Sequence, residues 1–349
     1  MIDSAVYWSK RKALSYAALY NFIQGGRGIG KTYSMKEWCI SDFLKSGKEF
    51  VWVRRYKEEL RQKYLLSFAD DIADKFPNHH ITIKGKELFV DKEKTGTFIV
   101  LSTSAFQKSV PMPNVNKGVF DEFVLEKGVT KYLQNEVHTF LNLDSTIARM
   151  RDESLPITED LRWFFLANRV SYINPYFDYF KIKAPVEPGF AYKNGCLIEI
   201  CDSSKYKQRY DNTRRGKILK DTPFYSYAIG NDPYSDESKF IENFSLGNCD
   251  FKFSIMLNDM IVGCWMDRSD YKLGFADSAP STNRTYVIQQ EDHSPNTLWL
   301  KTFKRSPDIQ LMLTAYASGL IKYKNVRSMH IMNAVSYTHL RAHETLRHL

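Results

Sequence analysis

The chain has no long apolar run and no signal that would export it. No window approaches the roughly 18 uninterrupted apolar residues that a membrane-spanning helix requires. The first residues, Met1-Ile2-Asp3-Ser4, carry an acid where a secretory signal has a base followed by an apolar stretch. We therefore expect a cytoplasmic protein with no membrane partner.

Cysteine is scarce and unevenly placed. The five cysteines are an odd number, and no two of them form a CxxC pair. Disulfide frameworks and zinc sites normally show an even, closely spaced set. We expect reduced, mostly packed thiols rather than metal ligands at these positions: Cys39, Cys196, Cys201, Cys249 and Cys264.

Acidic residues are outnumbered by basic ones, 40 against 49, which gives a net charge of +9. Hydrophobic residues make up 43% and charged residues 26%, as in an ordinary globular protein. A chain of 349 residues is long enough for two domains with cores of their own. The positive charge fits a polyanionic partner, but it also fits a merely basic surface, and composition does not choose between them.

The last fifteen residues, 335–349, differ from the rest. They have no hydrophobic period and contain three of the eight histidines, His339, His343 and His348. The stretch 335–345 resembles a translated sequencing adapter, so we predict a non-native tail and exclude it from the fold. A His-rich metal-binding tail is the alternative.

Up to about residue 200, strands are expected to alternate with helices. This pattern predicts an α/β domain at 1–205, with an open, mostly parallel sheet covered on both faces. The predicted strands are 20–24, 50–53, 97–101, 163–167 and 196–200, the helices 32–44, 60–76 and 133–141, and 81–90 forms a hairpin.

The pattern changes after residue 185, where Pro185, Pro188, Gly189 and Gly195 break the chain. A basic, polar linker is predicted at 206–238, and a smaller α+β domain at 239–334. Its predicted strands are 251–257, 260–266, 271–275 and 284–289, with one helix at 309–320. Asn258-Asp259 has the length and residue types of a two-residue hairpin turn, and we expect it to join the first two of these strands.

Residues 25–32 match the phosphate-binding pattern G-x-x-x-x-G-K-[ST] in full: Gly25, Gly26, Arg27, Gly28, Ile29, Gly30, Lys31 and Thr32. The glycines let backbone N–H groups converge on a β-phosphate, and the following helix adds its positive N-terminal end. We expect the Lys31 ammonium to reach the β- and γ-phosphates of ATP, and the Thr32 hydroxyl to hold Mg²⁺. A glycine-rich turn without a ligand is the alternative, which the flanking apolar strand and amphipathic helix disfavour.

A second motif ends an apolar strand about ninety residues later, at Val119-Phe120-Asp121-Glu122. Asp121 is placed to hold the water shell of the metal, and Glu122 to orient and deprotonate the attacking water. Such a string alone often marks only a strand end, but here it follows a complete phosphate loop. Asn168, at the end of the next central strand, is a candidate sensor of the γ-phosphate, with a strand-end cap as its alternative role.

Four strings stand out together by their order and spacing: NFIQGGRGIGKT at 21–32, VRRYKEEL at 53–60, VFDEF at 119–123 and NPYF at 174–177. They resemble the DNA encapsidation ATPase of small podoviruses. The likeness runs from about residue 12 to 205 and continues more weakly to about 333. The phosphate loop alone would indicate only a superfamily, whereas VRRYK and NPYF narrow the match to this family.

This resemblance implies a ring of identical subunits, taken to be five, docked on the portal of an empty procapsid in the host cytoplasm. The ring would drive double-stranded DNA into the procapsid with ATP and Mg²⁺, and part of the family also uses a structural RNA. Each subunit would join an additional-strand, catalytic-glutamate (ASCE) P-loop ATPase domain to a small domain similar to a vestigial RNase H nuclease.

The resemblance also implies basic residues donated to the ATP site by a neighbouring subunit. Motif alignment indicates Arg149 and Lys108, with Arg151 in reserve because 152–160 is longer and more acidic than the family pattern. A guanidinium beside the γ-phosphate stabilises the transition state by roughly 4–7 kcal/mol. The alternative for Arg149 is a solvated helix face.

Two basic segments are candidates for DNA contact. Arg54-Arg55 either faces DNA phosphates or lies near the nucleotide, and 205–220, with Tyr206 and Tyr210, either binds phosphates or is a solvated linker. A motor that moves any sequence needs cations directed at phosphates and no base-reading residues.

We predict no nuclease activity, because such activity needs several carboxylates converging on two metals. The acids of the second domain, such as Asp267, Asp277 and Asp292, show no spacing that commits them to one site.

Two other functions remain open. A helicase or cellular DNA pump could use the same core, although no further helicase motif is present and the chain is short. A nucleotide-switched binding module, which recruits a partner and hydrolyses slowly, is the second. Stimulation of hydrolysis by duplex DNA without strand separation distinguishes the packaging motor from both.

Overall fold

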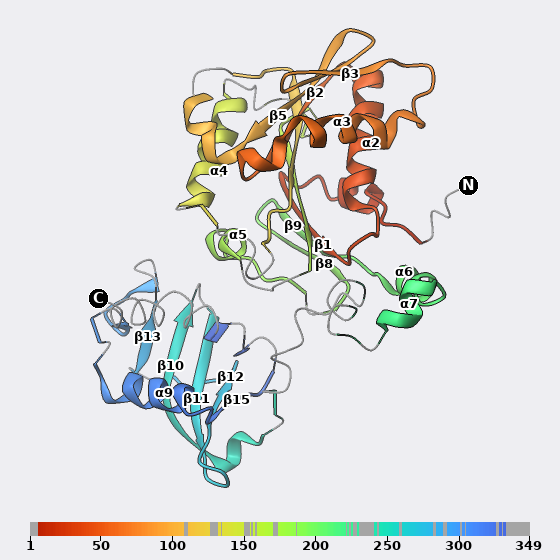
Figure 1. The fold of residues 1–349 in the computed structure, drawn as a ribbon. Helices are drawn as coiled ribbons and strands as arrows, with labels where there is room; N and C mark the ends of the chain where they lie inside the picture. Colours follow the sequence, from red (N-terminus) through yellow and green to blue (C-terminus); the bar gives the residue numbers. More distant parts are fainter. Residues whose placement is uncertain are drawn as a thin grey trace. The chain divides into compact units, whose positions relative to one another are not determined.

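The computed structural model divides into two compact units (Figure 1), which are described separately. Unit 1 comprises Met1–Val170 and Ile182–Pro233, and unit 2 comprises Ser171–Lys181 and Tyr234–Leu349. The structure describes residues 6–332 apart from 108–110, 126–131, 134, 150–153, 155, 158, 170–173, 186, 221, 223–224, 226–228, 230–240, 243, 258–259, 282–283, 289–291, 301, 304, 326–327 and 330. The predicted non-native tail therefore lies outside the described residues.

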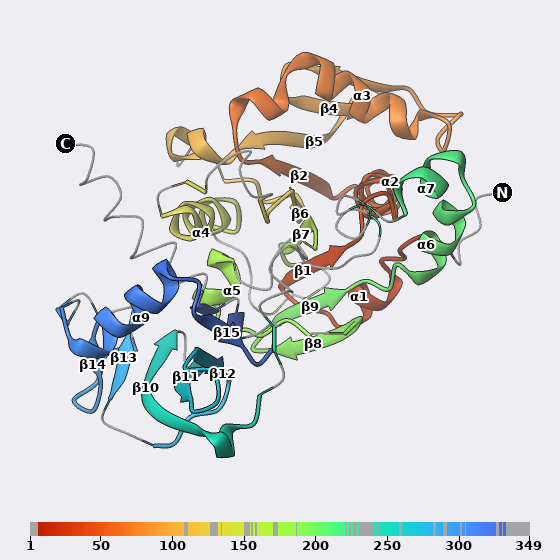
Figure 2. The same ribbon diagram turned by 60° about the horizontal axis from the view of Figure 1, so that its bottom comes forward.

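Unit 1 is built on a nine-stranded sheet with the order β3-β4-β5-β2-β6-β7-β1-β9-β8, which Figure 2 shows in succession. The six strands from β5 to β9 in this order are parallel, and the edges are closed by antiparallel pairs. The strands are β1 (Tyr20–Gly25), β2 (Glu49–Arg54), β3 (Ile81–Lys84), β4 (Glu87–Val90), β5 (Glu93–Val100), β6 (Val115–Asp121), β7 (Arg162–Asn168), β8 (Gly189–Lys193) and β9 (Cys196–Ile200).

Helices cover both faces of this sheet, as the alternating pattern predicts; α2 and α4 lie on opposite sides in Figure 1. Helix α3 packs on the same face as α2 through Leu65, Phe68 and Ile72, and the remaining helices are short. The α-helices of unit 1 are α1 (Arg11–Ser15), α2 (Lys31–Ser46), α3 (Gln62–Ala73), α4 (Glu136–Ile147), α6 (Ser204–Asp211) and α7 (Arg214–Leu219), and the 3-10 turns are η1 (Lys57–Leu60) and η2 (Leu101–Gln107).

Each face has its own core. On one face, buried residues at helical spacing on α2, among them Met35, Cys39 and Phe43, pack in one cluster with Trp52 and Phe68. On the other face, Phe140 of α4 lies 4.7 Å from Trp163 and 4.9 Å from Phe165, measured between ring centroids. The two packed faces fix the sheet rigidly, so the loops at the carboxyl ends of its strands are held in defined positions.

The strand order places β7 between β1, which carries the phosphate loop, and β6, which ends at Asp121. This inserted strand is the additional strand of the ASCE class of P-loop ATPases. The predicted fold class is therefore confirmed for unit 1.

The segment predicted as a linker differs from that expectation in its first part. Residues 204–219 contain α6 and α7, which belong to unit 1. Tyr206, Tyr210 and Leu219 pack against Tyr225 and Ile229 in a small cluster of their own. These two helices could not be predicted from the sequence, because they are short and strongly polar and bury almost no residues of their own.

Unit 2 is a six-stranded mixed sheet with the order β14-β13-β10-β11-β12-β15. β10, β11 and β12 form an antiparallel meander, with β13 added parallel to β10, and β14 parallel to β13. This arrangement fits the predicted RNase H-like topology. The elements are α5 (Pro175–Tyr179), η4 (Leu246–Asn248), β10 (Cys249–Leu257), β11 (Met260–Asp267), β12 (Leu273–Ala276), β13 (Thr285–Val287), β14 (Leu298–Trp299), α9 (Pro307–Ala317) and β15 (Ile321–Tyr323).

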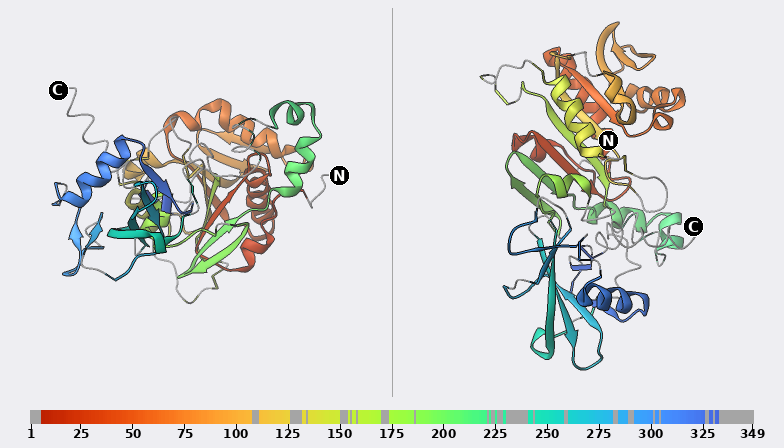
Figure 3. Two further views of the ribbon diagram at one scale, coloured as in Figure 1. Left: turned by 90° about the horizontal axis from the view of Figure 1, so that it is seen from below. Right: turned by 90° about the vertical axis from the view of Figure 1, so that its left-hand side faces the viewer.

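Helix α9 packs on this sheet through Ile309, Met312 and Ala315 (Figure 3). Leu257 and Met260 pair across the predicted hairpin, whose turn, Asn258-Asp259, lies outside the described residues. The ammonium of Lys322 lies 2.7 Å from Asp267 and holds the pKa of that carboxyl well below its usual range. No group of three or more His, Cys, Asp or Glu in the described part of the chain could hold a metal ion, and the absence of nuclease activity stays a prediction.

All five cysteines are free and buried, as expected. None of the helices within the described ranges is both long enough and apolar enough to cross a membrane.

Candidate active site

The glycine loop joins the buried strand β1 to helix α2, which begins at Lys31. Gly28 and Gly30 both have φ of 85°, in the left-handed region that favours glycine. A Cβ on Gly28 would lie 2.3 Å from the hydroxyl oxygen of Tyr206, and one on Gly25 would lie 2.7 Å from Cβ of Cys201. The loop therefore needs glycine both for its curvature and for its fit against the segment after β9.

Of the other loop residues, two make contacts that support the loop and one is exposed. Ile29 is buried in the core under α2, and its carbonyl oxygen accepts a hydrogen bond from the backbone N–H of Trp8. The backbone N–H of Gly26 donates to the hydroxyl of Ser203 at 3.1 Å. Arg27 is exposed and lines the cavity described below.

Lys31 points back into the loop. Its Nζ donates to the carbonyl oxygens of Gly25 at 3.0 Å and Gly26 at 2.9 Å, and the residue is only 6% exposed. Burial lowers the pKa of Lys31 to about 8. An ammonium that is already stripped of most of its water, and held by only two neutral carbonyls, is suited to receive the anionic oxygens of a phosphate chain.

The lowered pKa of Lys31 predicts a pH dependence of nucleotide binding. Well below pH 8 the ammonium is almost fully charged, so affinity for an ATP analogue should be at its maximum there. As pH rises above about 8, free protein loses this proton and affinity should fall, by up to about tenfold per pH unit. Equilibrium titrations between pH 7 and 10 measure this, and an affinity that stays constant to pH 9.5 would contradict it.

Thr32 and Asp121 meet across the gap between α2 and β6. The Thr32 hydroxyl donates to Oδ1 of Asp121 at 3.1 Å, although the two residues are 89 positions apart in sequence. Asp121 is 6% exposed, and burial raises the pKa of its carboxyl. A hydroxyl and a carboxylate oxygen side by side form the hard-oxygen donor set that Mg²⁺ prefers, so these residues fit the predicted metal.

Glu122 follows directly and has a different environment. Its backbone has φ of 62°, in the left-handed region that non-glycine residues rarely adopt. This conformation turns its side chain away from the course of the strand, and the side chain is 60% exposed. Strained backbone of this kind clusters at functional sites. The carboxylate lines the same cavity as Lys31, Thr32 and Asp121.

Arg54, at the carboxyl end of β2, ties the two acids together. Its Nη1 lies 3.1 Å from Oδ2 of Asp121, and its Nη2 lies 2.7 Å from Oε2 of Glu122. Sequence reasoning left Arg54 either facing DNA or near the nucleotide, and its position supports the second alternative. The structure explains this position, because β2 and β6 are neighbours and the carboxyl ends of parallel strands meet at one edge.

Arg55 faces the interior instead. It is 1% exposed, and its guanidinium binds both carboxylate oxygens of Glu136 as well as the carbonyl oxygens of Glu122 and Phe123. This side chain is therefore not available to DNA, and the interpretation of Arg55 as a DNA contact is wrong. Through these contacts, Arg55 holds the backbone of Glu122 and Phe123 in place.

Replacing Arg54 by methionine should destabilise the fold by about 3–5 kcal/mol, because it leaves the buried Asp121 carboxylate without its cation. Urea unfolding measures the change. A matched control is Lys94→Met, which removes an exposed ion pair with Glu87 at 3.0 Å and should cost less than about 1 kcal/mol. Equal losses in the two variants would contradict a structural role for Arg54.

One cavity of about 510 Å³ is lined by Lys31, Thr32, Asp121 and Glu122 together. Its size fits a drug-sized ligand or a nucleotide. Asn168 also lines it, at the end of β7, where its backbone pairs with Gly25. Sequence reasoning did not select the other polar residues of the lining, Tyr33, Lys36, Glu59 and Asp71.

Of the residues predicted to act in a neighbouring subunit, the structure describes only Arg149. Arg149 is exposed just beyond the end of α4 and is not among the cavity-lining residues. Lys108 and Arg151 lie outside the described residues. An exposed Arg149 is compatible with donation to another subunit, and its role stays a prediction.

Comparison with known proteins gives the family. The family model for the podovirus DNA encapsidation protein (Gp16) matches residues 2–342. The chain belongs to this family. The resemblance read from the four sequence strings is thereby confirmed.

Individual relatives agree. The DNA packaging protein of Bacillus phage phi29 is 34% identical over 326 residues, covering 93% of this chain and 95% of that protein. Among solved structures, the bacteriophage phi29 viral genome packaging motor assembly matches with a TM-score of 0.70 and 30% identity, over 96% of this chain and 99% of that one. The N-terminal domain of the DNA packaging ATPase from phi29 matches with a TM-score of 0.52 and 40% identity, over 57% of this chain and 97% of that one.

Proposed function

We propose that this chain is the ATP-hydrolysing subunit of a ring-shaped motor that moves double-stranded DNA into a procapsid. The observation that carries the proposal is the convergence of Lys31, Thr32, Asp121 and Glu122 on one cavity, in a chain of the DNA encapsidation family. The structural match to a viral genome packaging motor assembly supports a ring at a portal, in the cytoplasm of the host. Five subunits and a structural RNA partner remain part of the proposal.

Each side chain has a task that follows from its place. The N–H groups of the glycine loop and the Lys31 ammonium bind the β- and γ-phosphates, while Thr32 and Asp121 hold Mg²⁺. The metal, when bound, would draw negative charge from the phosphate oxygens. Glu122, exposed to the cavity, orients a water molecule and accepts its proton, and Asn168 contacts the γ-phosphate from β7.

Arg54 gives this site an inactive arrangement. Its guanidinium holds Oε2 of Glu122 at 2.7 Å, so this carboxylate is engaged by a cation and is not free to orient a water molecule. Hydrolysis therefore requires Glu122 to leave Arg54, or the pair to loosen. A site that stays inactive until the pair rearranges avoids hydrolysing ATP when no DNA is being moved.

The rate of ATP hydrolysis with and without duplex DNA tests the function. A motor should show strong stimulation by blunt duplex DNA without separating its strands. Stimulation accompanied by strand separation would favour a helicase. An unstimulated slow rate, with tight retention of nucleotide, would favour a nucleotide-switched binding module.

A mixing experiment tests whether Arg149 acts across subunits. Arg149→Ala and Glu122→Gln subunits should each be inactive alone, and mixed assemblies should recover part of the activity, because some interfaces combine an intact Glu122 with an intact Arg149. The measurement is ATPase rate against mixing ratio at constant total protein. Mixtures as inactive as both parents would contradict action in trans.

A further inference from the structure

The helices α6 and α7 concentrate the positive charge of the chain. Residues 204–220 hold seven basic residues and one acid, so this short segment carries a charge of +6 (7 minus 1), against +9 for all 349 residues. The cations are Lys205, Lys207, Arg209, Arg214, Arg215, Lys217 and Lys220.

One of these cations contributes to the fold: Nζ of Lys207 lies over the ring of Tyr225, 5.6 Å from its centroid. All but Lys207 are exposed, and none of the seven has an ion-pair partner within the part of the chain that the structure describes. The one acid, Asp211, accepts a hydrogen bond from the hydroxyl of Tyr225. Uncompensated cations this close together repel one another, so the arrangement is costly unless an anionic partner offsets it.

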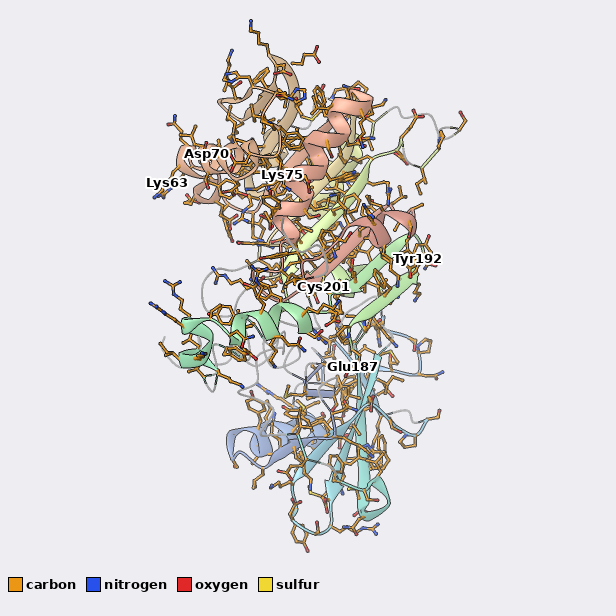
Figure 4. The ribbon with its side chains drawn as sticks, turned by 90° about the vertical axis from the view of Figure 1, so that its right-hand side faces the viewer. Lys63, Asp70, Lys75, Glu187, Tyr192 and Cys201 are labelled. Atoms are coloured by element: carbon orange, nitrogen blue, oxygen red, sulfur yellow. The ribbon has the colours of Figure 1, made fainter. Side chains whose placement is uncertain are left out.

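The two helices present the cations as a surface. Lys205 and Arg209 are four residues apart on α6 and so share a face, as do Arg214 and Lys217, three apart on α7. The helices meet closely at Gly216, where a Cβ would lie 2.0 Å from the carbonyl oxygen of Tyr210. Figure 4 shows this helix pair at the edge of unit 1.

The tyrosines of the segment indicate which form of nucleic acid fits. Tyr206 and Tyr210 stack on each other with centroids 6.3 Å apart, and Tyr210 packs on Tyr225 at 6.2 Å. Their rings are thus occupied within the protein and offer no platform for unpaired bases, which single-stranded nucleic acid needs. Exposed cations without exposed aromatic rings suit a duplex, whose bases are hidden and whose phosphates are outside.

The same segment touches the phosphate loop. Ser203, which caps α6, accepts a hydrogen bond from the backbone N–H of Gly26 at 3.1 Å. One turn later, the hydroxyl of Tyr206 fills the space that a side chain at position 28 would occupy. A force on α6 is therefore transmitted to the backbone that binds the phosphates of ATP.

We propose that α6 and α7 bind the sugar-phosphate backbone of double-stranded DNA, and that Ser203 and Tyr206 couple this surface to the phosphate loop. The choice of DNA rests on the proposed function. Because such coupling is reciprocal, duplex DNA changes the affinity for ATP by the same factor by which ATP changes the affinity for DNA.

Charge reversal tests the surface. The full chain carrying Lys205→Glu, Arg209→Glu and Lys217→Glu is compared with one carrying Lys63→Glu, Lys75→Glu and Lys86→Glu. The second set changes the net charge equally at three exposed lysines, one on α3, one two residues beyond its end and one in the β3–β4 turn; Figure 4 labels Lys63 and Lys75. Binding of a short DNA duplex is measured over a range of salt concentrations, and thermal melting confirms that both variants are folded.

The α6–α7 variant should lose at least about tenfold in affinity, and its slope of log K against log salt should become shallower by about 2–3, at roughly 0.9 per phosphate contact. The control should keep the wild-type slope. Equal losses in both variants, or unchanged binding by the α6–α7 variant, would contradict DNA binding by this surface.

Replacement of the same three residues by glutamine repeats the test if the charge-reversal variant does not fold. An RNA duplex of the same sequence is measured in parallel. If it binds more tightly than the DNA duplex, and if the substitutions weaken only RNA binding, the assignment to DNA is wrong.

The coupling needs its own measurement. Affinity for a non-hydrolysable ATP analogue is determined with and without saturating duplex, in the wild-type chain and in Ser203→Ala/Tyr206→Phe. We expect a ratio of at least about fivefold in the wild type and a ratio near one in the variant, which should still bind DNA. An unchanged ratio in the variant would refute the coupling.

The rate of ATP hydrolysis distinguishes failure of this inference from failure of the proposed function. If duplex DNA stimulates hydrolysis equally in the α6–α7 variant and the wild type, the DNA-binding surface is wrong but the motor function stands. If wild-type hydrolysis is not stimulated at all, both are wrong.

Discussion

Lys31→Ala should abolish ATP hydrolysis and lower the affinity for nucleotide by at least about hundredfold. The ammonium is buried, partly dehydrated and hydrogen-bonded to the carbonyl oxygens of Gly25 and Gly26, so the substitution removes the cation that the loop itself holds for the β- and γ-phosphates. Each hydrogen bond to a charged group contributes roughly 1.5–3 kcal/mol, and two such bonds correspond to at least this loss. Binding of a fluorescent ATP analogue and phosphate release measure the two effects.

The control for this variant is Lys45→Ala, in the last turn of the same helix, where the side chain is exposed. It should bind and hydrolyse ATP as the wild-type chain does. Turnover by Lys31→Ala within about tenfold of the wild-type rate would disprove the assignment of the site.

Glu122→Gln should separate binding from cleavage. The amide keeps the size of the side chain and can still contact Arg54, but it cannot accept a proton from water. Loss of a general base costs roughly 10²–10⁴ in rate, so hydrolysis should fall by at least about hundredfold while affinity for ATP is retained. Single-turnover phosphate release and equilibrium binding, made on the same preparation, test the two parts.

Glu58→Gln is the matched substitution at an exposed glutamate of η1. It should leave both measurements unchanged. Normal phosphate release by Glu122→Gln would refute the role of Glu122, and a parallel loss of binding would show that the residue holds the nucleotide rather than the water.

The central part of the fold followed from the sequence because its signals are local and agree with one another. Residues 20–24 and 163–167 are apolar runs of strand length, and both lie in neighbouring central strands. Met35, Cys39 and Phe43 recur at helical spacing, and the helix that they predict ends at Gly47, whose φ of 69° is the usual left-handed stop. The pairing of Thr32 with Asp121 was expected from the motif spacing, and the two side chains do meet.

What escaped sequence reasoning depends on tertiary contacts. Helices α6 and α7 are short and polar, and they are held by packing of Tyr206 and Tyr210 on Tyr225 rather than by an amphipathic pattern. Two adjacent arginines look equivalent in the string VRRYK, yet alternation along the chain sends Arg54 to Asp121 and Arg55 to Glu136. Which of two neighbouring side chains faces a site is decided by the register of β2, and that register was not visible before the strand had partners.

Equilibrium binding of labelled ATP to the purified chain, with Mg²⁺ present and then removed by a chelator, tests the central claim most directly. The geometry of the loop, Lys31 and the Thr32–Asp121 pair predicts one nucleotide bound per chain, with affinity that falls when the metal is withdrawn. A chain that takes up no nucleotide while Mg²⁺ is present would contradict the site, and the motor function proposed from it.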